Sequence, residues 1–261
     1  SSRRSSRSKN RRKANSLITK KFRAKNMDTN NQEIPLHEQK PGDWVLVKTH
    51  QFIAFNKPAG LPVQGDKTGD KSLLQLGEIY SKSRLYLVHR IDRPATGIVI
   101  FAKTNSAAQA LSEQFQQRTA QKSYLAVVKN LPPETEGVLR HVLQKNERTN
   151  RSKVVSGENE EEGKMAELKY KVLGSSENYH LLEIELLSGR HHQIRAQLAA
   201  AGCPVKGDVK YGFRRGNKDR SIHLHAWKLT FKHPVSGEEI RLEAPLPKDP
   251  VWDAFQIFAK S

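Results

Sequence analysis

The segment LYLVHRIDRPATGIVIFAKT, residues 85–104, decides the fold of this chain. Its two apolar runs, Leu85–Val88 and Ile98–Ala102, have the length and composition of buried strands. Charged residues gather in the loop between them, at positions 89–96. We therefore predict a strand-loop-strand unit, in which the sheet holds a polar loop in a fixed place.

Strand patterns continue on both sides of this unit. Upstream, DWVLVKTHQFIAFNKP predicts a hairpin of two strands, Trp44–Lys48 and Phe52–Asn56, which Pro58 ends. Downstream, Tyr124–Val128 is rich in β-forming residues. In Leu181–Leu187, leucine and isoleucine alternate with glutamate, as in a half-buried strand.

The remaining segments predict a hairpin, an exposed arm and two helices. Residues 222–245 give two strands joined at 234–237, and the polar segment 144–165 predicts a long exposed loop or hairpin arm. One helix follows Thr104 or Asn105 as N-cap, with apolar residues at helical spacing, namely Ala108, Leu111 and Phe115. A second helix, His192–Ala201, ends at Gly202. Together these elements predict an α+β fold, with a mixed, mainly antiparallel sheet and flanking helices.

Charge is distributed unevenly along the 261 residues, whose formal net charge is +18. Residues 1–26 hold 11 Lys or Arg and no acid, which leaves 34 basic and 27 acidic residues, or +7, for residues 27–261. We expect residues 1–26 to be a disordered basic tail: a phosphate-binding arm, a transit-peptide remnant or a leader that is not native. Residues 27–42 form a short lead-in and residues 43–261 a single domain.

Composition also excludes several classes of protein. No apolar stretch approaches the ~18 to 20 residues that span a bilayer, and no signal-peptide pattern is present. The single cysteine, Cys203, cannot form an intramolecular disulfide or a cysteine-rich zinc site, so we expect a cytoplasmic protein. The basic excess favours an anionic partner. No strongly apolar interface is apparent, which predicts a monomer.

The loop HRIDRPATG, residues 89–97, places Asp92 between two arginines. A carboxylate flanked by guanidinium groups is held in its charged form, as a nucleophile or general base requires. A structural ion-pair loop explains the same pattern.

The segment SGRHHQIRAQLAAAG, residues 188–202, runs from a strand into the start of a helix. Arg190 and the first-turn N–H groups can face an anion there, and Arg195 can reach a carboxylate on another loop. An ordinary solvated, charged helix end is the alternative.

Other residues give weaker signals. Imidazoles at positions i and i+2 favour a metal site, but no acidic or thiol partner has ligand-like spacing around His191, His192, His223, His225 or His233. Tyr124 fits a core aromatic residue, or one that stacks on a flipped base. No glycine-rich nucleotide motif is present, so we expect neither metal nor cofactor.

Five segments in order resemble the RluA-type pseudouridine synthases, over roughly residues 45–247. They are NKPAGLPV at 56–63, VHRIDRPATGIVIFAKT at 88–104, QKSYLAVV at 121–128, SGRHHQIRAQLAAAGCPVKGDVKYG at 188–212 and LHAWKLTFKHPVSG at 224–237. The resemblance implies an enzyme that isomerises uridine to pseudouridine in structured RNA, either rRNA or tRNA, without cofactor or metal. Members flip the base out, break its glycosidic bond, turn the uracil and rejoin it through C5.

The resemblance also implies roles for individual residues. Asp92 would attack or deprotonate the nucleoside, Tyr124 would stack on the uracil and assist loss of the C5 proton, and Arg195 would pair with Asp92. Arg93 would intrude into the RNA and hold the base out, while Gly189 and Arg190 would shape the loop beneath the site. The implied RNA-binding residues are Arg90, Arg93, Lys57, Arg190 and His192.

Two motifs depart from the family pattern. Ala95 and Thr96 stand where the family usually has Thr followed by Ser or Thr, and His191 replaces Thr in the usual GRTHQIR. We expect these changes to affect site shape and substrate choice. Residues 27–42 are too few for the S4 RNA-binding domain of many relatives, so the chain resembles the short branch that lacks it.

Two other functions compete with this one. The altered loop is compatible with a catalytically silent RNA-binding or RNA-chaperone protein on the same fold. A metal-dependent hydrolase that uses the histidines is the third hypothesis, and it requires tightly bound metal.

Overall fold

The structure is a computed structural model that describes residues 39–156 and 161–260. These residues belong to one compact unit, residues 35–261. The predicted basic tail 1–26, and the lead-in up to residue 38, lie outside the described residues.

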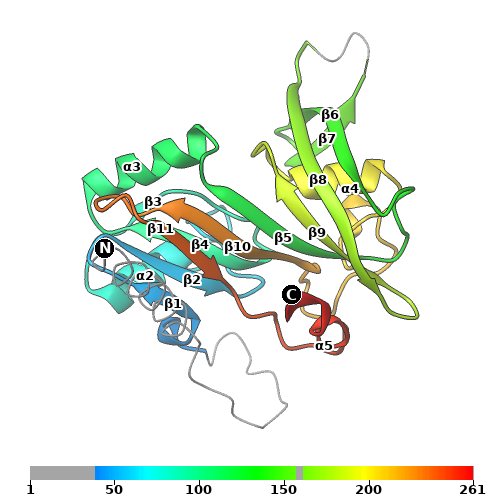
Figure 1. Cartoon of the computed structure of the whole chain (residues 1–261). Coiled ribbons are helices and arrows are strands. Elements are labelled where there is room, and N and C mark those ends of the chain that lie inside the picture. The colour runs from blue at the N-terminus through cyan, green and yellow to red at the C-terminus, as the bar shows by residue number, and fades with distance from the viewer. Residues whose placement is uncertain (1–38, 157–160, 261) are drawn as a thin grey trace, which may run out of the picture. The chain divides into compact units, whose positions relative to one another are not determined.

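One sheet organises the described part of the chain, and its eleven strands run in the order β1-β2-β4-β10-β5-β9-β8-β6-β7, with β3 beside β4 and β11 beside β10 (Figure 1). The strands are β1 (Val45–Lys48), β2 (Phe52–Lys57), β3 (Tyr86–Leu87), β4 (Thr96–Ala102), β5 (Gln121–Val128), β6 (Glu136–Asn146), β7 (Arg151–Val155), β8 (Lys164–Ser175), β9 (His180–Leu186), β10 (Leu224–Lys232) and β11 (Glu239–Glu243). Long strand β5 joins the two halves of the sheet, because it pairs with β10 on one side and β9 on the other.

Strand pairing is antiparallel except between β4 and β10, where Thr96 lies beside His225 in a parallel pair. Gly97 permits this pair: its φ is +112°, and a Cβ there would lie 2.3 Å from the carbonyl oxygen of Ala226. Only glycine fits such an approach. The prediction of an α+β fold with a mixed, mainly antiparallel sheet is confirmed.

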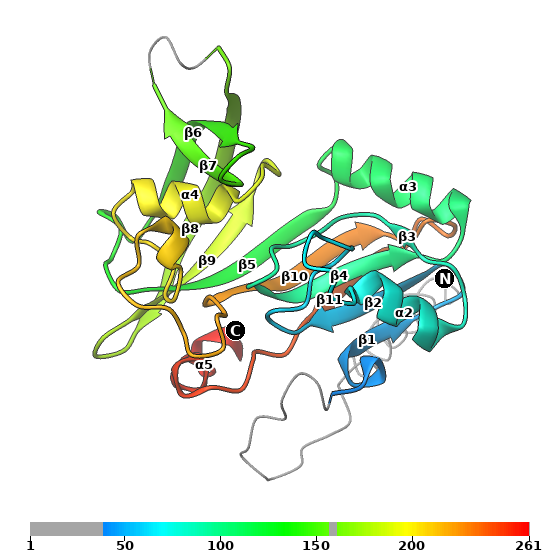
Figure 2. The same cartoon turned by 180° about the vertical axis from the view of Figure 1, so that it is seen from behind.

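Helices cover both faces of the sheet. Leu73 of α2 (Leu73–Ser81) and Ile194 of α4 (Gln193–Ala200) pack in the core that contains Tyr124. Leu111 of α3 (Asn105–Gln116) and Phe255 of α5 (Pro250–Phe255) belong to two clusters formed by the opposite side chains of the strands. Figure 2 shows α2 and α4 on the near face, seen from behind. Three 3-10 helices lie among the described residues, η1 (Pro41–Trp44), η3 (Val209–Tyr211) and η4 (Phe258–Lys260).

The elements differ from the sequence expectations in a few places. Only Tyr86–Leu87 of the predicted strand 85–88 is paired, because β3 lies at the end of β4. Of the two alternatives predicted for the polar segment 144–165, a loop or a hairpin arm, the structure shows the hairpin, formed by β6 and β7. Helix α2 was not predicted, although Ser72 and Gln75 form a capping box that marks its start.

Candidate active site

Asp92 lies in the loop between β3 and β4, which the sheet holds at both ends. Its carbonyl accepts a hydrogen bond from the Ala95 amide at 3.1 Å, which closes a tight turn around the carboxylate. The side chain is 23% exposed, so it can be reached from a cleft.

Buried Lys57, at the end of β2, stabilises the loop that contains Asp92. Its Nζ donates to the carbonyl oxygens of Pro58, Leu61 and Arg93 at 2.8, 2.9 and 3.0 Å. Burial lowers the pKa of Lys57 to about 7, against the raising effect of the Asp92 charge. Lys57 is wholly buried, so the expectation that it contacts RNA is replaced by a structural role under the Asp92 loop.

Arg195, in the first turn of α4, brings the two predicted segments together. Its Nη1 donates to Asp92 Oδ2 at 2.9 Å, so the pairing that the sequence predicts is present. Its Nε and Nη2 donate to the two carboxylate oxygens of Asp208 at 2.6 and 2.8 Å. Burial opposes the charge of Arg195, but these carboxylates outweigh it and raise the pKa of the guanidinium.

Asp208 was missed at the sequence level. It precedes η3, is 1% exposed, and makes a bidentate pair that fixes the plane of the Arg195 guanidinium. Asp208 therefore sets the orientation in which Arg195 meets Asp92. No hydrogen bond to Asp92 Oδ1 is recorded among the described residues, which leaves that oxygen available to a substrate.

Tyr124 projects from β5 into the same cleft and is 8% exposed. Burial, and then the charge of Asp92, raise the pKa of its phenol. The hydroxyl is therefore protonated at neutral pH.

The turn before α4 is shaped by Gln193, which is 3% exposed. Its Oε1 accepts hydrogen bonds from the Ser188 hydroxyl at 2.8 Å and the Arg190 amide at 3.0 Å. Its Nε2 donates to the Glu167 carbonyl on β8 at 3.0 Å. This helix start is thus packed against the sheet, unlike the solvated helix end considered above.

Two arginines flank Asp92 in the sequence and have different surroundings. Arg93 Nε donates to the Gly60 carbonyl at 2.7 Å, and its other nitrogens bind Asp66, Thr68 and Asp70. Arg90 is exposed and lines the cleft. Arg90 thus lines the cleft, whereas Arg93 binds the Asp66–Asp70 loop and keeps 36% of its side chain exposed.

The cleft has a volume of about 720 Å³ and is lined by one carboxylate and several cations. The carboxylate is Asp92. The cations are Arg90, Arg118, Lys122, Lys145, Arg190 and Arg195. Such a lining attracts a polyanion, and Asp92 is its single acidic group among the residues that the structure describes.

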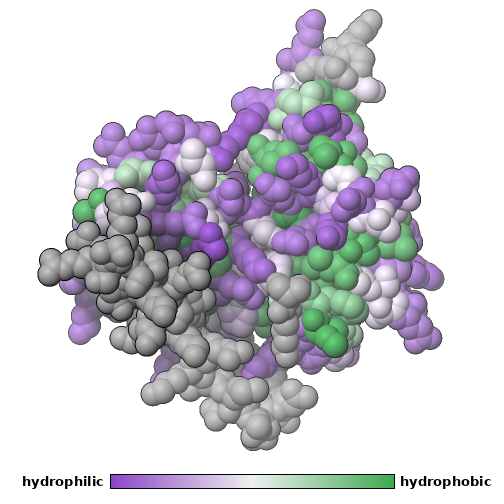
Figure 3. Space-filling model, in the orientation of Figure 1, coloured by the Kyte–Doolittle hydropathy of each residue, from purple (hydrophilic) through white to green (hydrophobic). Residues whose placement is uncertain are grey.

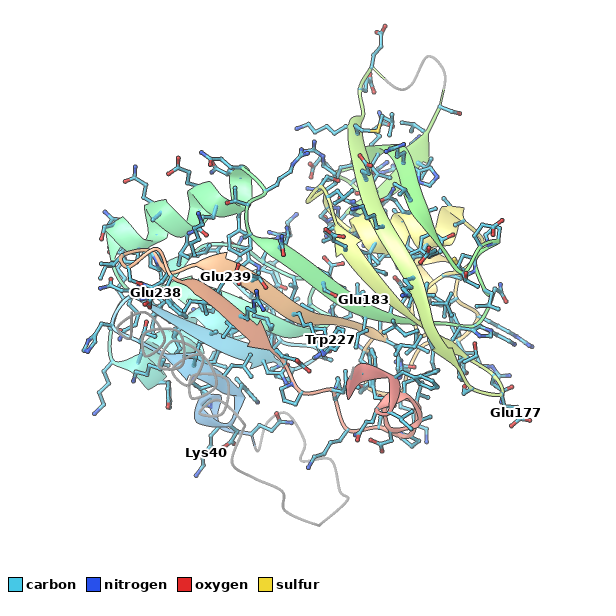
Figure 4. The ribbon with its side chains drawn as sticks, in the orientation of Figure 1. Lys40, Glu177, Glu183, Trp227, Glu238 and Glu239 are labelled. Carbon is cyan, nitrogen blue, oxygen red and sulfur yellow. The ribbon has the colours of Figure 1, made fainter. Side chains whose placement is uncertain are left out.

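A second groove, of about 740 Å³, lies on the other face of the sheet. Its lysines and glutamates are nearly balanced: Ser123 donates to Glu183 at 2.8 Å and Lys169 pairs with Glu185 at 3.7 Å. Figure 3 shows hydrophilic residues in the middle of this face, and Figure 4 labels Glu183 there. Because its charges neutralise one another, we place the candidate active site in the cleft that contains Asp92.

The histidines have partners inside the protein. His225 Nδ1 lies 2.7 Å from the Thr96 hydroxyl, and His223 Nε2 lies 3.2 Å from an Asp249 oxygen. Within residues 39–156 and 161–260, no three His, Cys, Asp or Glu side chains are grouped as a metal site requires.

Comparison with known proteins places this fold and site in one enzyme family. The family model described as RNA pseudouridylate synthase matches residues 51–200. This chain therefore belongs to the RNA pseudouridylate synthase family. The matched region includes Asp92, Tyr124 and Arg195, as the sequence motifs predicted.

Individual relatives agree with this assignment. The ribosomal large subunit pseudouridine synthase C proteins of Pasteurella multocida and Yersinia pestis are 33% and 34% identical over 77% and 78% of this chain. The chain spans 64% and 66% of the length of those two relatives. The solved human RNA pseudouridylate synthase domain containing 4 is 25% identical, with a TM-score of 0.65 over 79% of this chain and 90% of its own. Among the described residues, no helix is long and apolar enough to cross a membrane.

Proposed function

We propose that this protein is an RNA pseudouridine synthase that uses Asp92 as its catalytic carboxylate. The observation that carries the proposal is the one carboxylate that the described residues contribute to the cleft, held by Arg195 and surrounded by cations. Family membership and the ribosomal names of the relatives support the same activity.

The cationic lining supports an RNA substrate. Each phosphate that lysine or arginine neutralises releases condensed counterions and strengthens binding. Arg190 is suited to this contact, because its Nε is anchored to the Met165 carbonyl at 3.0 Å and its outer nitrogens are free of recorded bonds among the described residues. Arg118, Lys122 and Lys145 extend the same lining.

The reaction needs a nucleophile or base beside the nucleoside. The N1–C1′ bond of the uridine breaks, a C5–C1′ bond forms, the C5 proton leaves and N1 gains a proton, so no atoms are gained or lost. Asp92 Oδ1 either attacks the nucleoside or removes a proton from it, while Arg195 holds Oδ2. Because Asp208 fixes Arg195 in advance, the carboxylate does not have to reorient during the reaction.

Tyr124 serves in this scheme as the stacking partner of the uracil. Aromatic stacking stabilises a flipped base whatever its orientation, which suits a base that is turned during the reaction. A phenol with a raised pKa is a donor rather than a resting base. Its part in loss of the C5 proton is therefore limited to a proton relay.

Base flipping leaves a gap in the RNA stack that costs a few kcal/mol. Arg90 lies at the cleft beside Asp92, so we assign it the insertion into the RNA that the resemblance suggested for Arg93. Arg93 instead anchors the loop with Asp66 and Asp70.

The substrate proposed from the relatives' names is large-subunit ribosomal RNA, and tRNA is the alternative. The predictions of a monomer, of a cytoplasmic location and of catalysis without cofactor or metal stand beside this proposal. Analytical ultracentrifugation, localisation of a tagged protein and elemental analysis test them one by one.

A pseudouridine map of total rRNA and tRNA tests the proposal in cells. Cells that lack the gene are complemented with wild type or with Asp92→Ala, and carbodiimide adducts are mapped by primer-extension stops. We expect one or more stops to disappear in the deletion and to return only with wild type. If no site changes, or if Asp92→Ala restores the stops, the catalytically silent RNA-binding function replaces this one.

A further inference from the structure

The hairpin of β6 and β7 reaches the active site through one buried residue. Ser152, on β7, is 5% exposed and uses both of its donors there. Its amide donates to the Tyr211 hydroxyl oxygen at 2.8 Å, and its hydroxyl donates to the His191 carbonyl at 2.7 Å. The hairpin is therefore fastened to η3 and to the start of α4.

The Tyr211 hydroxyl connects Ser152 with His192. Because its oxygen accepts from the Ser152 amide, its own proton needs an acceptor, and His192 Nδ1 lies 2.9 Å away. Burial raises the pKa of Tyr211, so that proton stays in place at neutral pH. An Nδ1 that accepts leaves the proton of a neutral imidazole on Nε2.

His192 Nε2 is turned toward the catalytic carboxylate. It lies 3.8 Å from Asp92 Oδ2, the oxygen that also accepts from Arg195. A shift of about 1 Å would bring it to hydrogen-bond distance. Burial lowers the pKa of His192 to about 3, against the raising effect of the Asp92 charge, so the ring is neutral.

The backbone at His192 is also unusual. Its φ is +52°, a left-handed conformation that is strained for a residue other than glycine. The ring is held in turn by stacking on His191, with ring centroids 3.8 Å apart. Such a conformation persists only where its surroundings enforce it, and it sets the direction of the imidazole here.

We propose that His192 is a positioning residue, kept as the Nε2–H tautomer by the relay from Ser152 through Tyr211, and that it orients Asp92 for reaction. This proposal rests on the proposed function and goes beyond it, because it makes the β6–β7 hairpin a part of the active site. His192 then acts through Asp92 rather than as the RNA contact that the sequence suggested.

NMR and kinetics test this relay together. Long-range 1H–15N spectra of imidazole report the tautomer, and single-turnover rates and RNA dissociation constants report function. We expect wild-type His192 to be the Nε2–H tautomer. In Tyr211→Phe, the tautomers should mix and the rate constant should fall about tenfold, while RNA affinity stays within about twofold. Tyr179→Phe is the matched control, since Tyr179 lies between β8 and β9, where its ring contacts Lys206, and takes no part in the relay.

A second pair of variants keeps the test independent of Tyr211 and of folding. His192→Gln retains an N–H near Nε2, whereas His192→Ala does not, and both carry the same left-handed strain. We expect His192→Gln to react about tenfold faster than His192→Ala. An Nδ1–H tautomer in the wild type, an unchanged rate in Tyr211→Phe, or equal rates in the His192 variants would each overturn the proposal. Wild type that makes no pseudouridine would instead reject the proposed function, and the tautomer would still be measured.

Discussion

The Arg195 guanidinium meets the Asp92 carboxylate through one nitrogen, Nη1 to Oδ2 at 2.9 Å. The Nε and Nη2 atoms of Arg195 donate to the carboxylate of Asp208, which is buried. Asp208 thus fixes the orientation of the Arg195 guanidinium, and Asp92 accepts a hydrogen bond from the nitrogen that Asp208 leaves free. This arrangement orients a partly exposed carboxylate without occupying both of its oxygens.

Replacement of the catalytic carboxylate should separate activity from folding. Asp92→Asn is expected to reduce the single-turnover rate at least about a thousandfold, which corresponds to about 4 kcal/mol of barrier. The fold should persist, because Arg195 keeps its bidentate partner. Thermal unfolding checks the fold, and Asp253→Asn, on the surface of α5, is the control. A variant that retains a tenth of the wild-type rate would exclude this role for Asp92.

Loss of the buried ion pair should affect both stability and rate. Asp208→Asn leaves a buried guanidinium with one carboxylate fewer, so we expect a loss of about 3 kcal/mol in the free energy of unfolding. The rate constant should fall, and RNA affinity should not. Glu239→Gln breaks the exposed pair with Arg241 and should change the free energy by less than about 1 kcal/mol. Equal effects of the two variants in urea unfolding would contradict this account.

The sequence was informative about strands and motifs, and less so about burial. Asp92, Tyr124 and Arg195 could be proposed as site residues because they stand in ordered motifs, and the structure shows the predicted contact between Arg195 and Asp92. The sequence could not show the role of Lys57. A lysine before a proline gives the same sequence pattern whether its ammonium group faces solvent or donates to three buried carbonyl groups, as it does here.

The other differences between expectation and structure concern which way a side chain points and which loops lie close together. Arg90 and Arg93 both flank Asp92, and only the tight turn shows that one lines the cleft while the other binds the loop with Asp66. Asp208 is 13 positions from Arg195, a separation that no helix or strand period predicts. Such contacts depend on how the loops pack.

Lys57 should prove structural. Lys57→Met leaves three buried carbonyls without their donor, and we expect the protein to lose about 3 kcal/mol of stability. Lys48→Met, at an exposed position of β1, should cost little. Chemical unfolding gives the stabilities. Unchanged stability, together with a weaker salt dependence of RNA binding, would restore Lys57 as a phosphate contact.

The two arginines beside Asp92 should differ in RNA binding. Arg90→Gln is expected to reduce the slope of log affinity against log salt by about 0.7 to 0.9, the value for one phosphate contact. Arg93→Gln should leave that slope unchanged and should loosen the loop that contains Asp66 and Asp70. Filter binding over a salt series measures both. The reverse order of effects would return the RNA contact to Arg93.

Buried histidines should make the fold sensitive to acid. Burial lowers the pKa of His225 to about 4, against a small raising effect of its bond to Ala244, and an unfolded histidine titrates near 6.5. Between these pH values the unfolded chain binds the proton and the folded chain does not. Stability is therefore fully present above pH 6.5 and is lost as pH falls toward 4, by about 1 kcal/mol per pH unit.

His225→Phe removes this titration, so its free energy of unfolding should vary less with pH between 4.5 and 6.5 than that of the wild type. The comparison concerns the slope, because loss of the bond to Thr96 lowers stability at every pH. His50→Phe, at an exposed turn, is the control. Parallel curves for wild type and His225→Phe would show that His225 does not titrate in this way.

The central claim is that Asp92 drives the isomerisation of uridine, and loss of the C5 hydrogen reports that reaction directly. RNA labelled with tritium at C5 of uridine is incubated with purified wild type or with Asp92→Asn. We predict that wild type releases tritium to water in step with pseudouridine, identified by nucleoside mass spectrometry, and that Asp92→Asn releases it at least about a thousandfold more slowly. Tritium release by Asp92→Asn at the wild-type rate, or none by folded wild type on total cellular RNA, would contradict the account.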